Sequence, residues 1–196
     1  MAEELVRGDA ERLKAALPPL PAAVERPALV AVSGLPGSGK THFSRRLAER
    51  LSAVVLESDF LRRVLFARPT YGAEESHRLF EACYFLIEEL LRAGRHVIFD
   101  ATNLRERHRQ RLYDIADRAG AKLVLVRVRA PVDIVRERLL GRRGEIVPGE
   151  WSEASWEVYL RMRRTSERIR RRHLVVDTSR NIEPAVERVT REVERR

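Results

Sequence analysis

ALVAVS followed by GLPGSGKT, residues 28–41, is the stretch of sequence that decides the fold. The apolar run at 28–33 predicts a buried strand, and residues 34–41 fit the pattern G-x-x-x-x-G-K-[S/T] at every position. Glycines in such a turn let successive backbone N–H groups point at phosphate oxygens, and the helix that follows adds the positive end of its dipole. The stretch therefore predicts a phosphate-binding P-loop between a strand and a helix.

Two side chains of this turn have separate predicted roles. Lys40 is long enough to reach the β- and γ-phosphates of ATP, and the Thr41 hydroxyl is a ligand for Mg²⁺. The alternative, a glycine-rich turn with an incidental lysine, does not explain why the whole pattern matches in a strand–helix context. We therefore expect ATP and Mg²⁺ as cofactors. The predicted nucleotide-binding residues are Gly34, Pro36, Gly37, Ser38, Gly39, Lys40, Thr41 and His42.

Beyond this turn, the chain alternates apolar strands with helices. Near-continuous apolar strands separated by helices indicate a parallel sheet with helices on both faces. We predict an α/β fold, specifically a three-layer P-loop NTPase fold with a five-stranded parallel sheet and an arginine-bearing lid. The strands are predicted at 28–33, 53–57, 96–100, 122–128 and 173–177, and the helices at 40–51, 58–66, 73–93, 105–119, 132–140, 152–171 and 183–194.

The N-terminal segment precedes this alternation. A short amphipathic helix is predicted at 3–17, and the prolines that follow it make a stiff link. We therefore divide the chain into an appended segment at 1–27 and a main domain at 28–196, whose lid spans about 136–150.

Composition indicates a single globular domain without a membrane partner. The chain has 196 residues, 44% of them hydrophobic and 34% charged, and no apolar run approaches the length of a membrane span. Its one cysteine, Cys83, excludes an intrachain disulfide, and we expect a cytoplasmic protein. The formal charge of +9 favours phosphate-rich partners only weakly, because 38 basic residues include just three lysines and arginine is spread along the chain. No protein partner is evident.

An acid follows the second predicted strand. Asp59 lies at the carboxyl edge of the sheet, where ligands bind in such folds, and a carboxylate there can accept the proton of an attacking hydroxyl. Arg62, three residues on, is on the same helical face and can hold an anionic group of the acceptor. The alternative for Asp59 is a helix N-cap, and Glu57 is a second candidate base.

A second acid ends the third predicted strand. Asp100 occupies the position from which a carboxylate reaches Mg²⁺, directly or through water. Thr102 and Asn103 follow it, at the predicted start of the next helix, and can offer hydrogen bonds to phosphate or substrate. For Asn103 the alternative is a helix cap.

Arginines follow the fourth predicted strand and its helix, beside the glycines of a loop at 141–149. Arginines that close over a nucleotide stabilise the charge of the transferring phosphoryl group and exclude water. We predict this catalytic role for Arg138 and for Arg142 or Arg143. The alternative is a solvated basic helix end.

In this order the motifs resemble the P-loop kinase family that contains polynucleotide 5′-hydroxyl kinases and related kinases of the AAA_33 and zeta-toxin-like types. The resemblance runs from about residue 29 to residue 189. The family's turn GxPGSGK[S/T] is GLPGSGKT here, its D-x-T-N segment is DATN at 100–103, and its paired lid arginines correspond to 138–143. An Asp three positions before an Arg, here Asp59 and Arg62, provides the base and a clamp for the acceptor's phosphate in that family.

The resemblance implies a kinase that transfers the γ-phosphoryl group of ATP to a hydroxyl. It also implies that the turn at 177–179 passes near the adenine. We expect the 5′-OH end of a polynucleotide as acceptor. A small-molecule hydroxyl kinase, acting on an antibiotic, a sugar or a nucleotide sugar, is the alternative. A nucleotide-responsive binding module is a third possibility, against which the intact set of Lys40, Thr41, Asp59 and Asp100 argues.

Overall fold

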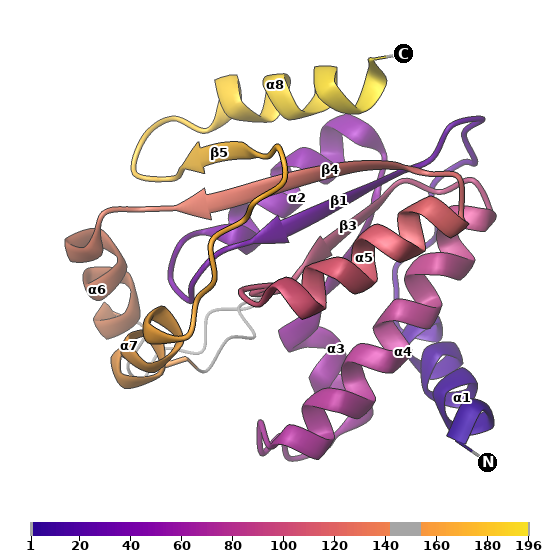
Figure 1. Cartoon of the computed structure of the whole chain (residues 1–196), viewed down its shortest axis with the longest axis horizontal. Coiled ribbons are helices and arrows are strands. Elements are labelled where there is room, and N and C mark those ends of the chain that lie inside the picture. The colour runs from indigo at the N-terminus through magenta and orange to yellow at the C-terminus, as the bar shows by residue number, and fades with distance from the viewer. Residues whose placement is uncertain (1, 142–153, 196) are drawn as a thin grey trace.

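The computed structural model describes residues 2–141 and 154–195, in which five parallel strands form one sheet (Figure 1). The strand order is β2-β3-β1-β4-β5, and every neighbouring pair is parallel. The predicted fold class is therefore confirmed. The strands are β1 (Ala28–Ser33), β2 (Val54–Glu57), β3 (Val97–Asp100), β4 (Lys122–Arg129) and β5 (Leu174–Asp177).

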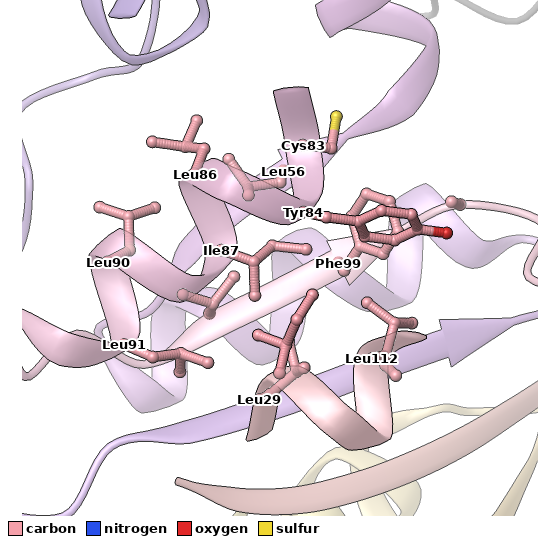
Figure 2. Packing of buried hydrophobic residues seen from close by; sticks show 14 of the residues in the cluster. Leu29, Leu56, Cys83, Tyr84, Leu86, Ile87, Leu90, Leu91, Phe99 and Leu112 are labelled. Atoms are coloured by element: carbon pink, nitrogen blue, oxygen red, sulfur yellow. The ribbon is translucent and has the colours of Figure 1, made fainter. Parts of the chain in front are cut away.

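Helices cover both faces of this sheet, as alternation along the strands requires. In β1, Leu29 and Ala31 pack into the core beneath α4 and α5, while Val30 and Val32 pack into the core beneath α2 and α8. Figure 2 shows residues of the first of these cores: Leu29, Leu56 and Phe99 of the sheet lie in one cluster with apolar side chains of α4 and with Leu112 of α5. The helices are α1 (Ala2–Ala15), α2 (Lys40–Leu51), α3 (Ser58–Leu65), α4 (Ala73–Arg92), α5 (Glu106–Arg118), α6 (Val132–Gly141), α7 (Trp156–Arg164) and α8 (Glu183–Glu194).

The strand register aligns the C-terminal ends of the strands β1, β2 and β3. Glu57 at the end of β2 lies opposite Asp100 at the end of β3, and Asp100 lies opposite Val32 near the end of β1. The strand order reverses at β1, because β3 and β2 lie on one side of it and β4 and β5 on the other. The loops after β1, β2 and β3 therefore leave the sheet beside one another, at the position where open α/β sheets bind ligands.

Helix α1 packs against α4 and contributes to the same core. Ala10 and Leu13 are fully buried in it. Asp9, 3% exposed, accepts two hydrogen bonds from Arg78 of α4, at 2.6 and 2.8 Å. The proline-containing link after the helix is held as well, since Val24 N–H donates to the carbonyl of Gly94.

The helix predicted at 152–171 is too long at its C-terminal end. Helix α7 ends at Arg164, and the chain then runs without helical structure to β5. The reason is tertiary: the Glu167 N–H donates to the carbonyl of Leu104, and the carbonyls of Glu167 and Arg168 accept from the buried guanidinium of Arg109. These contacts replace the hydrogen bonds that a longer helix would make, and they could not be derived from local periodicity.

None of the helices in the described part of the chain combines the length and apolar character that a membrane crossing requires.

Candidate active site

The turn after β1 has the backbone of a phosphate-binding loop. Gly37 and Gly39 have φ angles of 74° and 84°, in the left-handed region that favours glycine. Gly39 also needs to lack a side chain, because a Cβ there would lie 2.8 Å from Thr178 Oγ1. Helix α2 begins at the next residue, so its unpaired N–H groups and dipole face the concave side of the turn. His42, predicted to bind nucleotide, is exposed on the first turn of this helix.

Lys40 and Thr41 lie beside the acid at the end of β3. The Lys40 ammonium donates to the carbonyl of Leu35 within the turn, at 3.2 Å, and its charge acts on Asp100. Asp100 is 2% exposed, and burial raises the pKa of its carboxyl, against the Lys40 charge and a hydrogen bond from Thr41, which lower it. Its Oδ2 is buried without a hydrogen-bond partner among the described residues.

This pair of oxygens fits a magnesium ion that is held mainly by phosphates. A hard cation prefers hydroxyl and carboxylate oxygens, which Thr41 and the unpartnered Oδ2 of Asp100 provide. In the described residues there is no cluster of three or more Asp, Glu, His or Cys side chains that would hold a metal by itself. If a magnesium ion binds here, Thr41 and Asp100 are the ligands that the protein would supply, and nucleotide and water would supply the others.

Asp59 and Glu57 complete an acidic group at this edge of the sheet. Asp59 is half-buried in the first turn of α3, and its charge acts on both Glu57 and Asp100. Glu57 is bound by Arg45 of α2 at 3.0 Å. Burial and the charge of Asp100 nevertheless raise the pKa of Glu57 to about 7. The structure thus brings Asp59, Glu57 and Asp100 close enough for their charges to interact.

Arg62 lies between α3 and α4, and only 5% of the residue is exposed. Its guanidinium forms an ion pair with Glu75, donates to Ser76 Oγ at 3.2 Å and lies over the ring of Tyr71, 4.7 Å from the centroid. Sequence reasoning did not foresee this partner. Its predicted role as a clamp for an acceptor phosphate requires the guanidinium to exchange Glu75 for the phosphate.

Asn103 is a bridge between the loops that follow β1 and β3. It is 2% exposed with φ 44°, and its Nδ2 donates to the carbonyl of Val32 at 2.7 Å. The alternative of a helix cap is wrong, because α5 begins at Glu106 and its N-cap residue is Arg105. The Asn103 Oδ1 is buried without a partner in the described residues, so one acceptor at this site remains for another group.

Arg138 of α6 connects the phosphate loop with the turn after β5. It donates to the carbonyl of Gly37 at 3.3 Å, and to the hydroxyl and carbonyl oxygens of Thr178 at 2.9 and 2.8 Å. These acceptors are neutral, so the guanidinium keeps its net charge beside the loop. The other two predicted lid residues, Arg142 and Arg143, lie outside the described residues.

Thr178 and Arg109 are the structural residues that sequence reasoning missed. The Thr178 hydroxyl donates to the carbonyl of Ser38 at 2.7 Å, so the turn after β5 braces the phosphate loop from behind. Arg109 is 1% exposed and donates to the carbonyl of Asn103 at 2.8 Å. Thr178 lies in the turn at 177–179 that was predicted to pass near the adenine, which was the one signal available for it.

These features define a P-loop nucleotide-binding protein: a glycine turn that follows a buried strand, a Lys and a Thr beside the acid that ends β3, and a second acid on the helix that follows β2. The family described as an AAA domain matches residues 29–180. The chain belongs to this P-loop kinase family, which confirms the resemblance seen in the sequence.

Individual relatives agree with this class. The L-seryl-tRNA(Sec) kinase of Methanococcus maripaludis is 25% identical over 136 residues, which are 67% of this chain and 52% of that protein. The chain thus spans about half the length of this curated relative. The crystal structure of APE1195 has a TM-score of 0.71 and 26% identity, covering 88% of this chain and 98% of that one. The APS kinase CysC of Mycobacterium tuberculosis, solved with AMPPNP and APS, has a TM-score of 0.65 and 22% identity over 86% of this chain and 98% of its own.

Proposed function

We propose that this protein is an ATP- and Mg²⁺-dependent kinase that transfers the γ-phosphoryl group to a hydroxyl. The observation that carries the proposal is the placement of the Asp59 carboxylate with Asp100 and Glu57 beside Lys40 and Thr41. A carboxylate at the carboxyl edge of the sheet, opposite a phosphate loop, is what transfer to an alcohol needs in addition to nucleotide binding.

In the proposed reaction, Asp59 accepts the proton of the acceptor hydroxyl. The hydroxyl oxygen forms a bond to the γ-phosphorus as the bond from that phosphorus to the β–γ bridging oxygen breaks, and ADP leaves. Lys40 and Arg138 hold the phosphate oxygens and stabilise their charge. Thr41 and Asp100 would hold Mg²⁺, which would neutralise negative charge on the phosphates.

The acceptor is proposed to be the 5′-OH end of a polynucleotide. Three features support an acceptor that is part of a nucleic acid: the basic balance of the chain, the Asp59–Arg62 spacing, and a relative whose name specifies a serine attached to a tRNA. A small-molecule acceptor is the second candidate. The specific observation in its favour is the Arg62–Glu75 ion pair, which occupies the group proposed to hold the acceptor's phosphate.

The test is transfer of label from γ-labelled ATP to DNA and RNA oligonucleotides with 5′-OH ends. Wild-type protein is expected to label them, and Asp59→Asn to reduce the rate by about 10²–10⁴-fold. Asp117→Asn is the matched control, since Asp117 is exposed near the C-terminal end of α5. Absence of labelling on every end, combined with ADP release in the presence of hydroxylated metabolites, would transfer the proposal to the second acceptor class. ATP turnover that is indifferent to Asp59→Asn would refute the proposed base.

A further inference from the structure

A basic surface runs from the last turn of α7 into the segment that follows this helix. Residues 161–172 contain seven arginines and a single acid, Glu167. All seven arginines are exposed, and no hydrogen bond or ion pair within the described residues reaches the guanidinium groups of four of them. The arginine strip is defined as Arg163, Arg164, Arg168 and Arg170.

The one acid of this segment does not neutralise the strip. Glu167 Oε2 accepts a hydrogen bond from the Glu106 N–H at 2.7 Å, at the start of α5. The carboxylate is thus engaged with the positive end of a helix dipole. Like charges on one short segment, with no counterion among the described residues, repel one another, so binding of an anion stabilises the arrangement.

The backbone that carries the strip is fixed. Arg109, fully buried, donates to the carbonyls of Glu167 and Arg168 at 3.3 and 3.2 Å. Ile169, 5% exposed, packs into the core beneath α4 and α5. Arg171 lies over the Tyr113 ring, 4.0 Å from its centroid. Binding of a partner to this surface therefore costs little conformational entropy of the backbone.

The strip also lies next to the candidate active site. At its N-terminal end, Tyr159 of α7 packs with α6, and Leu35 of the phosphate loop packs against the same cluster. Further along, Glu167 is bonded to Leu104, which directly follows the DATN segment. Figure 1 shows the orange segment leaving α7 beside α6 and continuing to β5. A strand bound along the strip can therefore extend to the site that holds Asp59 and Asp100.

We propose that the arginine strip binds the sugar–phosphate backbone of the acceptor nucleic acid and guides its end into the active site. The inference rests on the proposed polynucleotide acceptor and deepens it by assigning the surface that holds the strand. Phosphates repeat along a nucleic acid, and a guanidinium binds each of them bidentately. A nucleic acid matches this surface better than an acidic protein. Several exposed guanidinium groups beside a phosphoryl-transfer site can each bind one of the regularly spaced phosphates of a strand.

The test is equilibrium binding of an oligonucleotide of about 16 nucleotides, labelled at its 3′ end, to the full chain without ATP. The variant Arg163→Gln/Arg164→Gln/Arg168→Gln is compared with wild type over a range of salt concentrations. Each phosphate contact on a single strand adds about 0.7 to the slope of log K against log salt, so the variant's slope should be smaller by about 2. Its thermal unfolding midpoint checks that the protein folds.

A matched control removes the same charge from the opposite edge of the sheet. Arg26, Arg191 and Arg195 are exposed near the amino ends of β1 and β4, and the carbonyl of Arg195 is bound by Lys122. The variant Arg26→Gln/Arg191→Gln/Arg195→Gln should retain the wild-type slope to within about half a unit. An equal loss of oligonucleotide affinity in the two triple variants would overturn the proposed role of the arginine strip, because the effect would then depend on net charge alone.

Two further outcomes separate the strip from the proposed reaction. Binding that depends on the arginine strip, without any transfer to a 5′-OH end, would support the strip as a nucleic-acid-binding surface and contradict the polynucleotide acceptor. Transfer to oligonucleotides at an unchanged rate in the strip variant would support the polynucleotide acceptor and contradict the proposed role of the arginine strip. Competition by polyglutamate as effective as that by an unlabelled oligonucleotide would show an acidic protein surface as the partner, and would overturn the proposal.

Discussion

Arg62 and Arg138 were both predicted to meet phosphate, but the structure gives them different partners. The charge of Arg62 is neutralised by Glu75, in an ion pair whose side chains are 7% and 10% exposed. Arg138 donates to the Gly37 carbonyl and to the oxygens of Thr178, all neutral. The charge of Arg138 is therefore available to a phosphate, whereas the charge of Arg62 is neutralised by an ion pair within the protein.

The partner of an arginine side chain, more than its position in a motif, therefore decides whether the guanidinium is available to a phosphate. A buried guanidinium that is paired with a carboxylate stabilises a particular packing, here that of α3 on α4. A half-buried guanidinium on carbonyl oxygens is oriented without being neutralised. The predictions below test this distinction.

The largest expected effect is loss of catalysis on neutralising Arg138. Arg138→Gln should lower kcat by about 10²–10³-fold, the range for removing one donor to transition-state charge, with a smaller effect on KM for ATP. Steady-state ADP release with a competent acceptor measures both constants. Arg136→Gln is the control, because Arg136 is exposed on the same helix and lies over the Trp156 ring. Equal losses in the two variants would contradict a specific role for Arg138.

The next effect is on stability, when the buried pair is broken. Arg62→Met removes the charge partner of Glu75, whose carboxylate keeps only its hydrogen bonds from Thr70 and Tyr71, and should lower the free energy of unfolding by about 1–3 kcal/mol. Urea unfolding of the single variant and of Arg62→Met/Glu75→Gln measures it, and the double variant should recover part of the loss. A loss below about 1 kcal/mol in Arg62→Met would contradict a structural pair. If the double variant folds but its KM for an oligonucleotide acceptor rises, Arg62 also serves the acceptor.

The third effect is on the pH dependence of stability, which Glu75 and Glu57 influence in opposite directions. Burial alone raises the pKa of Glu75, but hydrogen bonds from Thr70, Tyr71 and Arg62 lower it to about 2. The stability that this carboxylate contributes is present above the unfolded pKa near 4.5 and is lost as pH falls toward 2. The stability gap between wild type and Glu75→Gln should therefore narrow below pH 4.5, as measured by urea unfolding. A gap that stays constant from neutral pH to about pH 2.5 would contradict this linkage.

Glu57 provides the contrasting case. Its pKa is raised to about 7, so its ionisation reduces stability as pH rises from 4.5 through 7. Glu57→Gln should flatten that decline and leave the acid limb of the profile as in wild type. The same variant in the transfer assay separates a role of Glu57 in proton transfer from that of Asp59.

The smallest effect concerns the brace behind the phosphate loop. Thr178→Val removes the hydroxyl that donates to the Ser38 carbonyl and accepts from Arg138. We expect a loss of about 1 kcal/mol in unfolding free energy and a rise of a few fold in KM for ATP. Thr178→Ser keeps the hydroxyl and should restore both. Unchanged stability and KM in Thr178→Val would contradict a role of this hydroxyl in supporting the phosphate loop.

Local patterns were sufficient for much of the fold. The glycine turn, the apolar strands and the acids that end β2 and β3 are each encoded within a few residues, and the parallel rule then brings their ends together. The order of strands, the Arg62–Glu75 pair and the end of α7 were not predictable in this way. Each depends on groups from separate elements, such as Arg109 of α5 binding the carbonyls of Glu167 and Arg168. A carbonyl's distant partner leaves no trace in the periodicity of its own segment.

The most direct test is a crystal structure with a non-hydrolysable ATP analogue and Mg²⁺. The account predicts triphosphate along the turn at 34–41, with Mg²⁺ about 2.1 Å from Thr41 Oγ1 and reached by Asp100 directly or through one water. The γ-phosphorus should face the Asp59 carboxylate across a space that admits one hydroxyl oxygen. A terminal phosphate that faces away from Asp59, with that carboxylate bonded elsewhere, would contradict the assignment of hydroxyl phosphorylation to this site.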